Sequence, residues 1–185
     1  NLFLLINNIL DFSKIEAGKV DIEKIPFNLV DLVKQIARSL EARASENLNT
    51  IKVEVDSDFV PNLISDPLRI NQVITNLISN AIKFTQEGSI KIKLHQIAIH
   101  EKTSTFKIEV IDNGIGIDKG KFQSIFQKFS QAETNTSRQF GGTGLGLVIT
   151  KKLLNLLGSD IQFESELGKG SNFYFILHLP IDNKL

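Results

Sequence analysis

The sequence has 185 residues, 42% of them hydrophobic, so it is long enough to bury one sizeable core in a single domain. Its 21 acidic and 21 basic residues balance, which excludes an overall field that would recruit nucleic acid or an anionic membrane surface. The absence of cysteine excludes disulfides, thiolate metal sites and a cysteine nucleophile, and it fits a reducing compartment. The apolar runs are far shorter than a bilayer span. We expect a soluble chain that is part of a longer protein.

The first predicted element is the end of an amphipathic helix that stops at Ala17-Gly18. Its apolar residues recur at helical spacing: Leu2, Leu5, Ile6, Ile9, Phe12 and Ile15. This stripe is wide for one short helix, so it packs either on a partner that the chain lacks or on its own domain. Residues 20–27 alternate like a strand, and residues 29–48 have the apolar spacing of a second helix. A further strand is indicated by Ile51, Val53 and Val55.

The clearest helix start is Asp66-Pro67, because aspartate is a preferred N-cap and proline is favoured at the first helical position. One face of this helix is apolar and is expected to meet the core: Ile70, Val73, Ile74, Leu77, Ala81 and Phe84. The other face carries Asn76, Asn80 and Lys83 at positions i, i+4 and i+7. Such a polar stripe is either an ordinary solvated face or part of a binding site.

Two alternating segments, 89–99 and 106–111, are predicted strands, and the second runs directly into the letters DNGIGI. The glycines of this motif, Gly114 and Gly116, permit a tight turn or the close approach of a ligand to the backbone. The alternative is a simple strand-ending turn. Asp112 favours a site, because a carboxylate at the mouth of an apolar pocket needs donors, and the exocyclic amine of a purine is one.

Residues 130–139 are almost free of apolar side chains and are predicted to form a mobile loop. They lead into the letters FGGTGLGL, whose glycine spacing does not match a dinucleotide fingerprint. The segment does not match a Walker-type loop either, because no lysine follows Gly146. Bare backbone amides ahead of a helix nevertheless favour an anion, although a flexible hinge is the alternative. The remaining predicted elements are one helix and two strands: 145–157, 161–164 and 173–179.

Taken in order, these segments resemble the ATP-binding catalytic domain of sensor histidine kinases and, more broadly, the gyrase, Hsp90 and MutL type of ATPase. NLISNAIKFT resembles the family's N box, DNGIGI its first glycine box, FQSIFQKFSQ its F box and RQFGGTGLGL its second glycine box. LINNILDFSKIEAGK is similar to the end of the second helix of the dimerisation and histidine-phosphotransfer hairpin. The wording of the boxes is closest to hybrid kinases, which also carry receiver domains.

The resemblance implies an α+β fold, a two-layer α/β sandwich of the Bergerat type in which helices pack on one face of a mixed sheet. Residues 1–17 would be the end of the dimerisation-hairpin helix, and residues 18–185 would be the ATP-binding catalytic domain. The implied partners are ATP, the hairpin of the same or the partner subunit, and a response-regulator receiver domain, but not nucleic acid. The full-length protein would be a homodimer with this domain in the cytoplasm, either soluble or anchored to the membrane.

The resemblance also assigns roles to residues. Asp112 would accept a hydrogen bond from the adenine amine in the nucleotide site that Gly114 and Gly116 line, and Asn80 would be the Mg²⁺ ligand. Backbone amides of the second glycine box would bind the triphosphate: Gly142, Thr143, Gly144, Leu145 and Gly146. Phe126 would anchor the mobile loop as a lid together with Phe129, or else both are core aromatics.

Asn76 and Lys83 are the expected catalytic residues, with Lys83 facing the phosphates. The hydrolysing relatives have glutamate where this chain has Asn76, and an amide cannot take a proton from water at neutral pH. The expected reaction is therefore transfer of the γ-phosphoryl group to a histidine on the upstream hairpin, outside this chain. The alternatives are a nucleotide-binding pseudokinase scaffold and a freestanding ATPase. His100 begins a sequence like the acceptor motif but closes a predicted strand, so we expect it to stay unmodified.

Overall fold

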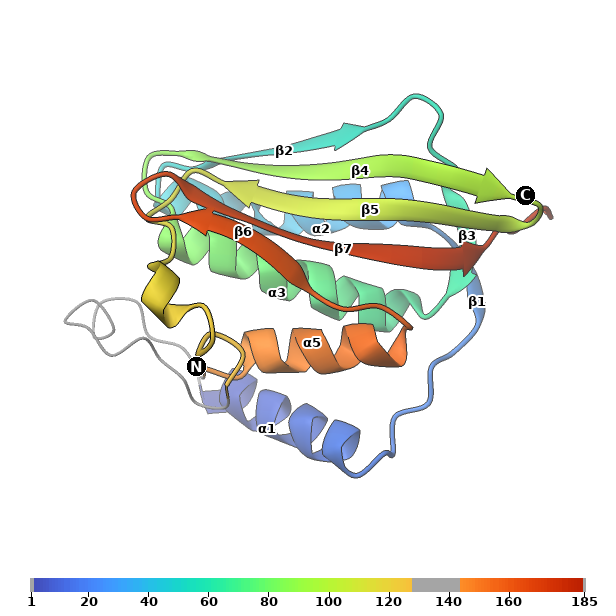
Figure 1. The fold of residues 1–185 in the computed structure, drawn as a ribbon, viewed down its shortest axis with the longest axis horizontal. Helices are drawn as coiled ribbons and strands as arrows, with labels where there is room; N and C mark the ends of the chain where they lie inside the picture. The colour runs from blue at the N-terminus through green and yellow to red at the C-terminus, as the bar shows by residue number, and fades with distance from the viewer. Residues whose placement is uncertain (1, 128–143, 185) are drawn as a thin grey trace.

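The computed structural model describes residues 2–127 and 144–184, and it has two layers, a sheet and a set of helices (Figure 1). The helices α2, α3 and α5 lie on one face of the five-stranded sheet, which confirms the expected α+β sandwich. The elements in chain order are α1 (Leu2–Glu16), β1 (Ile25–Asn28), α2 (Leu29–Glu46), β2 (Thr50–Val55), β3 (Asn62–Ser65), α3 (Pro67–Phe84), β4 (Ser89–His100), β5 (Thr103–Asp112), the 3₁₀ turn η1 (Lys119–Lys121), α5 (Gly146–Leu156), β6 (Gln162–Glu166) and β7 (Gly170–Pro180).

The large sheet is mixed and has the strand order β2-β4-β5-β7-β6. β2 runs parallel to β4, whereas the other neighbouring strands are antiparallel. The register places Asp112, the last residue of β5, beside Ser171 of β7, and it places Ser171 beside Ser165 of β6. One end of the sheet therefore carries three polar residues in a row on neighbouring strands.

Alternate residues of the central strands point toward the helices and form the core with them. The buried strand residues are Ile90, Ile92, Leu94, Phe106, Ile108, Val110, Phe175, Leu177 and Leu179. The helices contribute Val33, Ile36, Ile74, Leu77, Ile78, Ile149 and Leu153, among others. Burying each such side chain stabilises the fold by about 1.5–3 kcal/mol. This core holds the ends of β5 and β7 in place against α3 and α5.

α3 begins where the sequence predicts. One oxygen of the Asp66 carboxylate accepts the N-cap hydrogen bond from the backbone N–H of Arg69 at 3.1 Å, and Pro67 is the first helical residue. The expectation that Phe84 faces the core is wrong, because its side chain is 38% exposed. The buried part of α3 ends at Ile82, and Phe84 is the last helical residue, so it lies beyond the packed turn.

The strand predicted over residues 20–27 is much shorter than expected. β1 covers only Ile25–Asn28, and it pairs with β3, which the sequence analysis did not predict. A strand needs a partner for its backbone groups, and β3 offers only four residues before Asp66 caps α3. The length of β1 is therefore set by the length of β3.

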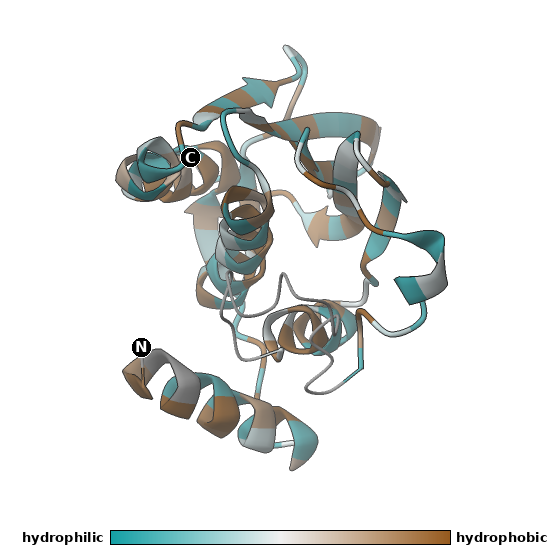
Figure 2. Cartoon of the chain, turned by 90° about the vertical axis from the view of Figure 1, so that its left-hand side faces the viewer, coloured by the Kyte–Doolittle hydropathy of each residue, from teal (hydrophilic) through white to brown (hydrophobic). Residues whose placement is uncertain are grey.

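α1 stops at Glu16, as predicted, and it docks on the body of the domain. The carboxylate of Glu16 lies 2.8 Å from the Lys152 ammonium of α5, and Asp11 accepts a hydrogen bond from Gln72 of α3 at 2.9 Å. The opposite face of α1 stays exposed and apolar (Figure 2), with exposed side chains at Leu2, Phe3, Ile6, Ile9 and Leu10. Of the predicted apolar stripe, Phe12 and Ile15 pack against the core of the domain, whereas Leu2, Ile6 and Ile9 stay exposed. Packing of the exposed residues on a partner helix stays a prediction. Within the described residues, no helix is long and apolar enough to cross a bilayer.

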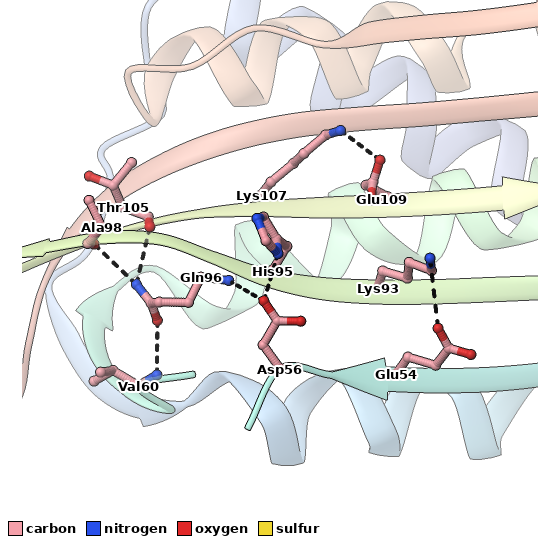
Figure 3. A network of polar contacts seen from close by, with 10 residues as sticks. All are labelled: Glu54, Asp56, Val60, Lys93, His95, Gln96, Ala98, Thr105, Lys107 and Glu109. Atoms are coloured by element: carbon pink, nitrogen blue, oxygen red, sulfur yellow. Dashed lines mark hydrogen bonds and ion pairs between the residues drawn. The ribbon is translucent and has the colours of Figure 1, made fainter. Parts of the chain in front are cut away.

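A separate set of polar contacts lies along β2, β4 and β5 and at the connection after β2 (Figure 3). His95 Nδ1 lies 2.6 Å from the carboxylate of Asp56, which also accepts a hydrogen bond from the backbone N–H of Gln96 at 3.0 Å. The Gln96 side chain in turn accepts a hydrogen bond from the Val60 N–H at 3.0 Å. These contacts fasten the connection after β2 to β4. His100 is exposed and ends β4, as the sequence analysis expected.

Candidate functional site

Asp112 is the last residue of β5, and its carboxylate is largely surrounded by neutral groups. Its Oδ1 accepts a hydrogen bond from the backbone N–H of Gly114 at 2.9 Å. Burial raises the pKa of the Asp112 carboxyl above its ordinary value, although the N–H groups of Gly114 and Ser171 act to lower it. A half-buried carboxylate with unused lone pairs is suited to accept a hydrogen bond from a ligand.

The glycines of the turn after Asp112 are required by the fold itself. Gly116 has φ +66°, and a side chain there would overlap the backbone carbonyl of Glu166. A side chain on Gly114 would overlap the carbonyl of Phe84. The turn is also fastened to the β6–β7 hairpin, because the Gly168 N–H donates to the Ile115 carbonyl at 2.7 Å. The turn with Gly114 and Gly116 thus holds Asp112 in a fixed position.

Asn76, in the polar stripe of α3, faces the seam between α3 and α5. The Asn76 amide Nδ2 donates to the hydroxyl of Thr150 on α5, at 3.4 Å. Thr150 is fully buried, so this bond orients the amide and leaves the carbonyl oxygen of Asn76 available. Asn80 lies one helical turn further along the same stripe. Within residues 2–127 and 144–184 its half-buried amide has no hydrogen-bond partner.

Lys83 ends the stripe in the last turn of α3. Its ammonium lies 4.9 Å from the centroid of the Phe84 ring. Burial lowers the pKa of Lys83, and the positive charge of Arg43 on α2 lowers it further. A half-buried cation with a second cation nearby favours an anion beside it, because an anion would offset both the burial of Lys83 and the repulsion from Arg43.

The N-terminus of α5 is held in place by Leu145, which is 1% exposed and packs in the core. Leu145 is the N-cap residue and has no side chain that could cap the helix. Gly144 precedes it with φ +67°, a conformation that glycine adopts without strain. The first-turn amides of an uncapped helix and the helix dipole both favour an anion at this end. Gly142 and Thr143, which were also predicted to bind the triphosphate, lie outside the described residues.

Gly146 provides a test of the predicted anion binding at the N-terminus of α5. Within the described residues a side chain added there would meet nothing within 4 Å, and the backbone of Gly146 is not left-handed, so this part of the fold does not require glycine. We expect Gly146→Ala to raise the free energy of unfolding by up to about 1 kcal/mol, since alanine favours a helix. The same substitution should weaken ATP binding by about 1–2 kcal/mol, through lost phosphate hydrogen bonds. Chemical denaturation and calorimetry measure the two effects.

The control for Gly146→Ala is Gly158→Ala at the other end of α5, where a side chain also meets nothing within 4 Å. We expect the control to leave ATP affinity unchanged. Unchanged ATP affinity in Gly146→Ala itself would contradict a role for this glycine in phosphate binding.

The described parts of the site border one region. The Ile115 N–H donates to the Phe84 carbonyl at 3.1 Å, which joins the turn after Asp112 to the end of α3. The hydrogen bond from Asn76 joins α3 to α5. The C-terminal end of α3, the N-terminal part of α5, the end of β5 and the start of β7 lie toward the same side of the fold (Figure 1). A hollow of about 540 Å³, lined in part by Ile117 and Ser165, opens beside the same turn.

Phe126 of the expected lid anchor is half-buried, and its ring lies 5.7 Å from that of Phe163. Phe122 lies 4.9 Å from the same ring, so the two fasten this segment to β6. Phe126 also packs against the core, which means that the two alternatives for it, anchor and core aromatic, do not exclude each other. Phe129 and the predicted loop at 130–139 lie outside the described residues.

Sequence reasoning missed three side chains that hold the site together. Thr150 interrupts the apolar face of α5, and a lone threonine there could have signalled a polar contact. Ser165 accepts from the Ile117 N–H at 2.9 Å and lies 2.8 Å from the Ser171 hydroxyl, which ties the turn to β6 and β7. No local pattern marks these serines, because the register of β6 and β7 brings them together.

Residues 65–182 match the family model described as histidine kinase-, DNA gyrase B-, and HSP90-like ATPase. The chain is 42% identical over 182 residues to the signal transduction histidine-protein kinase BarA of Escherichia coli (strain K12). It is 46% identical over 180 residues to the sensor protein GacS of Pseudomonas syringae pv. syringae. These matches cover 98% and 97% of the chain but 20% of each relative, so the chain spans about a fifth of their length.

The crystal structure of full-length ShkA in complex with AMPPNP matches this structure with a TM-score of 0.82 and 28% identity. That match covers 98% of this chain and 36% of the ShkA chain. The family match includes α3 with its asparagine stripe, the turn after Asp112 and the N-terminus of α5. The chain belongs to the histidine kinase-, DNA gyrase B-, and HSP90-like ATPase family, and it carries the catalytic ATPase domain found in sensor histidine kinases.

Proposed function

We propose that this chain binds ATP with Mg²⁺ and acts as the catalytic part of a histidine kinase, so that the γ-phosphoryl group passes to a histidine on an upstream dimerisation hairpin. The observation that carries this proposal is the amide of Asn76 at the seam between α3 and α5. An amide held by Thr150 cannot act as a general base for water. The geometry therefore supports transfer to an external acceptor better than hydrolysis.

The nucleotide-binding roles follow the position of each residue. Asp112 accepts a hydrogen bond from the adenine amine, because its carboxylate is the half-buried acceptor at the end of β5. The backbone N–H groups at the start of α5, from Gly144 to Gly146, bind the phosphates together with Gly142 and Thr143. Lys83 contributes positive charge to the same phosphates. These groups position the nucleotide and stabilise charge, which is most of what phosphoryl transfer requires of a protein.

Asn80 is the proposed ligand of Mg²⁺. Its amide supplies a neutral oxygen, and no hydrogen bond to another described residue competes for it. Among the described residues no cluster of three or more His, Cys, Asp or Glu could hold a metal ion. A single protein oxygen fits Mg²⁺, which commonly keeps waters and phosphate oxygens as its other ligands and neutralises phosphate charge.

The proposed partners are the hairpin, a second copy of the full-length protein and a receiver domain. The exposed apolar residues of α1 support the hairpin as a partner, because a helix with such an apolar face favours packing against another helix. The relatives are named as sensor and signal transduction kinases, and ShkA was crystallised with AMPPNP. These names support a role in two-component signalling. The proposed location of this domain is the cytoplasm, whether or not the full-length protein is anchored to a membrane.

Two further candidates make different predictions. A pseudokinase scaffold would bind ATP without phosphorylating anything, and a freestanding ATPase would release phosphate steadily from the isolated chain. The Asn76 amide argues against the ATPase. No observation in the described residues favours the scaffold, and the chain carries Asp112, Asn80 and Lys83, to which the kinase proposal assigns roles.

The test uses labelled ATP with Mg²⁺ and two proteins, this chain and a version extended upstream through the hairpin. We expect the extended protein to acquire acid-labile, base-stable phosphate, while the isolated chain acquires none. The substitution Asn80→Ala in the extended protein should remove the Mg²⁺ dependence of nucleotide binding and reduce transfer by at least about tenfold, as for a lost metal ligand.

Three outcomes would contradict the proposal. Label on His100 of the isolated chain would show that the acceptor does not lie on the hairpin. An unlabelled extended protein that still binds ATP would favour the scaffold. Steady phosphate release from the isolated chain would favour the ATPase.

A further inference from the structure

We propose that Thr85 is a positioning residue of the nucleotide site, whose hydroxyl orients the carboxylate of Asp112 toward the 6-amino group of adenine. This inference rests on the proposed function, because it requires Asp112 to be the adenine acceptor. Thr85, which follows α3, would then contribute to the selectivity of the site for a 6-aminopurine.

The backbone of Thr85 is held firmly. Thr85 follows the last residue of α3 in an extended conformation, with φ −116° and ψ 136°. Its carbonyl accepts a hydrogen bond from the side chain of Asn49 at 2.8 Å. The side-chain oxygen of Asn49 accepts a hydrogen bond from the Gly88 N–H at 3.0 Å. Thr85 therefore has little freedom to move away from the turn that follows β5.

The two branches of the Thr85 side chain face different glycines. A Cβ atom built on Gly88 would lie 2.6 Å from the Thr85 methyl carbon, and one built on Gly114 would lie 2.7 Å from the Thr85 hydroxyl oxygen. The methyl group thus packs toward Gly88, and the hydroxyl points toward Gly114. The N–H of Gly114 is the donor that already binds Asp112. The Thr85 hydroxyl consequently lies on the Asp112 side of the turn.

The hydroxyl of Thr85 is buried and has no hydrogen-bond partner within the described residues; the residue is 1% exposed. Leaving such a group unpaired costs about 1–3 kcal/mol, so it requires an explanation. Asp112 has lone pairs beyond the one that Gly114 uses, and the O–H of a threonine rotates to suit an acceptor. The hydroxyl does not form a complete hydrogen bond with Asp112 here. It completes one directly after a small shift, or through one bound water, when the nucleotide binds.

The groups that act on the pKa of Asp112 also support an interaction with the Thr85 hydroxyl. Burial raises the pKa of Asp112, and the nearby Thr85 hydroxyl acts in the opposite direction, after the N–H groups of Gly114 and Ser171. The groups that act on this carboxylate are the N–H of Gly114 in the turn, the N–H of Ser171 in β7 and the Thr85 hydroxyl after α3, all of them neutral. Only the ionised carboxylate has every lone pair free for donors. Removing the hydroxyl should therefore leave Asp112 protonated up to a higher pH.

The test compares Thr85→Val with Thr85→Ser in the full chain, by calorimetry with Mg²⁺ and a non-hydrolysable ATP analogue. Valine keeps the shape and removes the hydroxyl, whereas serine keeps the hydroxyl. We expect Thr85→Val to weaken binding about tenfold, as for one lost hydrogen bond, and Thr85→Ser to bind nearly as the native chain does. The loss of binding at acid pH should start at a higher pH in Thr85→Val. Purine riboside triphosphate, which lacks the 6-amino group, should bind the native chain and Thr85→Val equally.

Stability distinguishes this role from a purely structural one. Thr85→Val removes an unpaired buried hydroxyl, so its midpoint of thermal unfolding should be equal to or above that of the native chain. If Thr85→Val does not fold, Thr85→Ala is compared with Thr85→Ser in the same assays. Equal ATP affinity in the native chain and the valine variant would overturn the inference. So would an equal loss for the analogue without the amine.

Asp112→Asn separates failure of this inference from failure of the proposed function. If Asp112→Asn binds ATP like the native chain, Asp112 is not the adenine acceptor and the proposed nucleotide site is wrong. If Asp112→Asn loses affinity and Thr85→Val does not, the site stands and only the role of Thr85 is wrong.

Discussion

Asp112→Asn should weaken ATP binding by about 1–3 kcal/mol, the range for mispairing a buried polar group. The new amide presents N–H donors to the donor amine of adenine, whereas the carboxylate presents acceptors. Calorimetry with an ATP analogue measures the change. Asp118→Asn is a matched control, because Asp118 accepts a hydrogen bond from the N–H two residues ahead, at 2.8 Å, as Asp112 does at 2.9 Å. Asp118 is exposed and should leave the affinity unchanged.

The same substitution should increase the stability of the chain without ligand at neutral pH. The pKa of Asp112 is raised by folding, so its contribution to stability is fully present below the unfolded pKa and is lost as the pH rises through the folded pKa. At pH 7 the native chain bears the cost of a half-buried charge, and asparagine does not. The gain should disappear in acid, where both side chains are neutral. A lower stability of Asp112→Asn than of the native chain at pH 7 would show that the cost of burying the Asp112 charge is not the dominant effect.

Gly116→Ala should lower the free energy of unfolding by about 2–4 kcal/mol, which is large for a single surface turn. Two effects add: alanine is strained at φ +66°, and its Cβ would overlap the Glu166 carbonyl, which belongs to rigid backbone. Relief of the overlap would displace the turn from the β6–β7 hairpin. ATP affinity should fall as well, because Asp112 lies four residues before Gly116. Urea denaturation measures the stability.

Gly158→Ala separates the two effects, because Gly158 has φ +78° and no described atom lies within 4 Å of an added side chain. It has the conformational strain without the overlap, so its cost should be about 1 kcal/mol. An equal cost for both substitutions would mean that the contact with Glu166 yields, and that Gly116 is required only for its backbone conformation.

Several features of the fold could be predicted because neighbouring residues determine them. Asp66-Pro67 starts α3 through a cap and a ring that act within three residues, and Gly18 follows α1 in a left-handed conformation. The alternation of residues 106–111 predicted β5, and the glycine-rich segment before 145 correctly placed the start of α5. The residue types at Asp112, Asn76 and Asn80 indicated a nucleotide site through the family resemblance, and their individual roles stay predictions.

The sequence by itself determined the helices and the central strands of the large sheet, where α3 and α5 begin, and that asparagine stands at position 76. Only the tertiary structure decided the short pairing of β1 with β3, the exposure of Phe84, the contact of Asn76 with Thr150 and the burial of Thr85. The difference has a physical reason. Caps and periodicity depend on residues a few positions apart, whereas burial and pairing depend on groups far along the chain, such as Glu166 for Gly116, which only the packed core brings into contact.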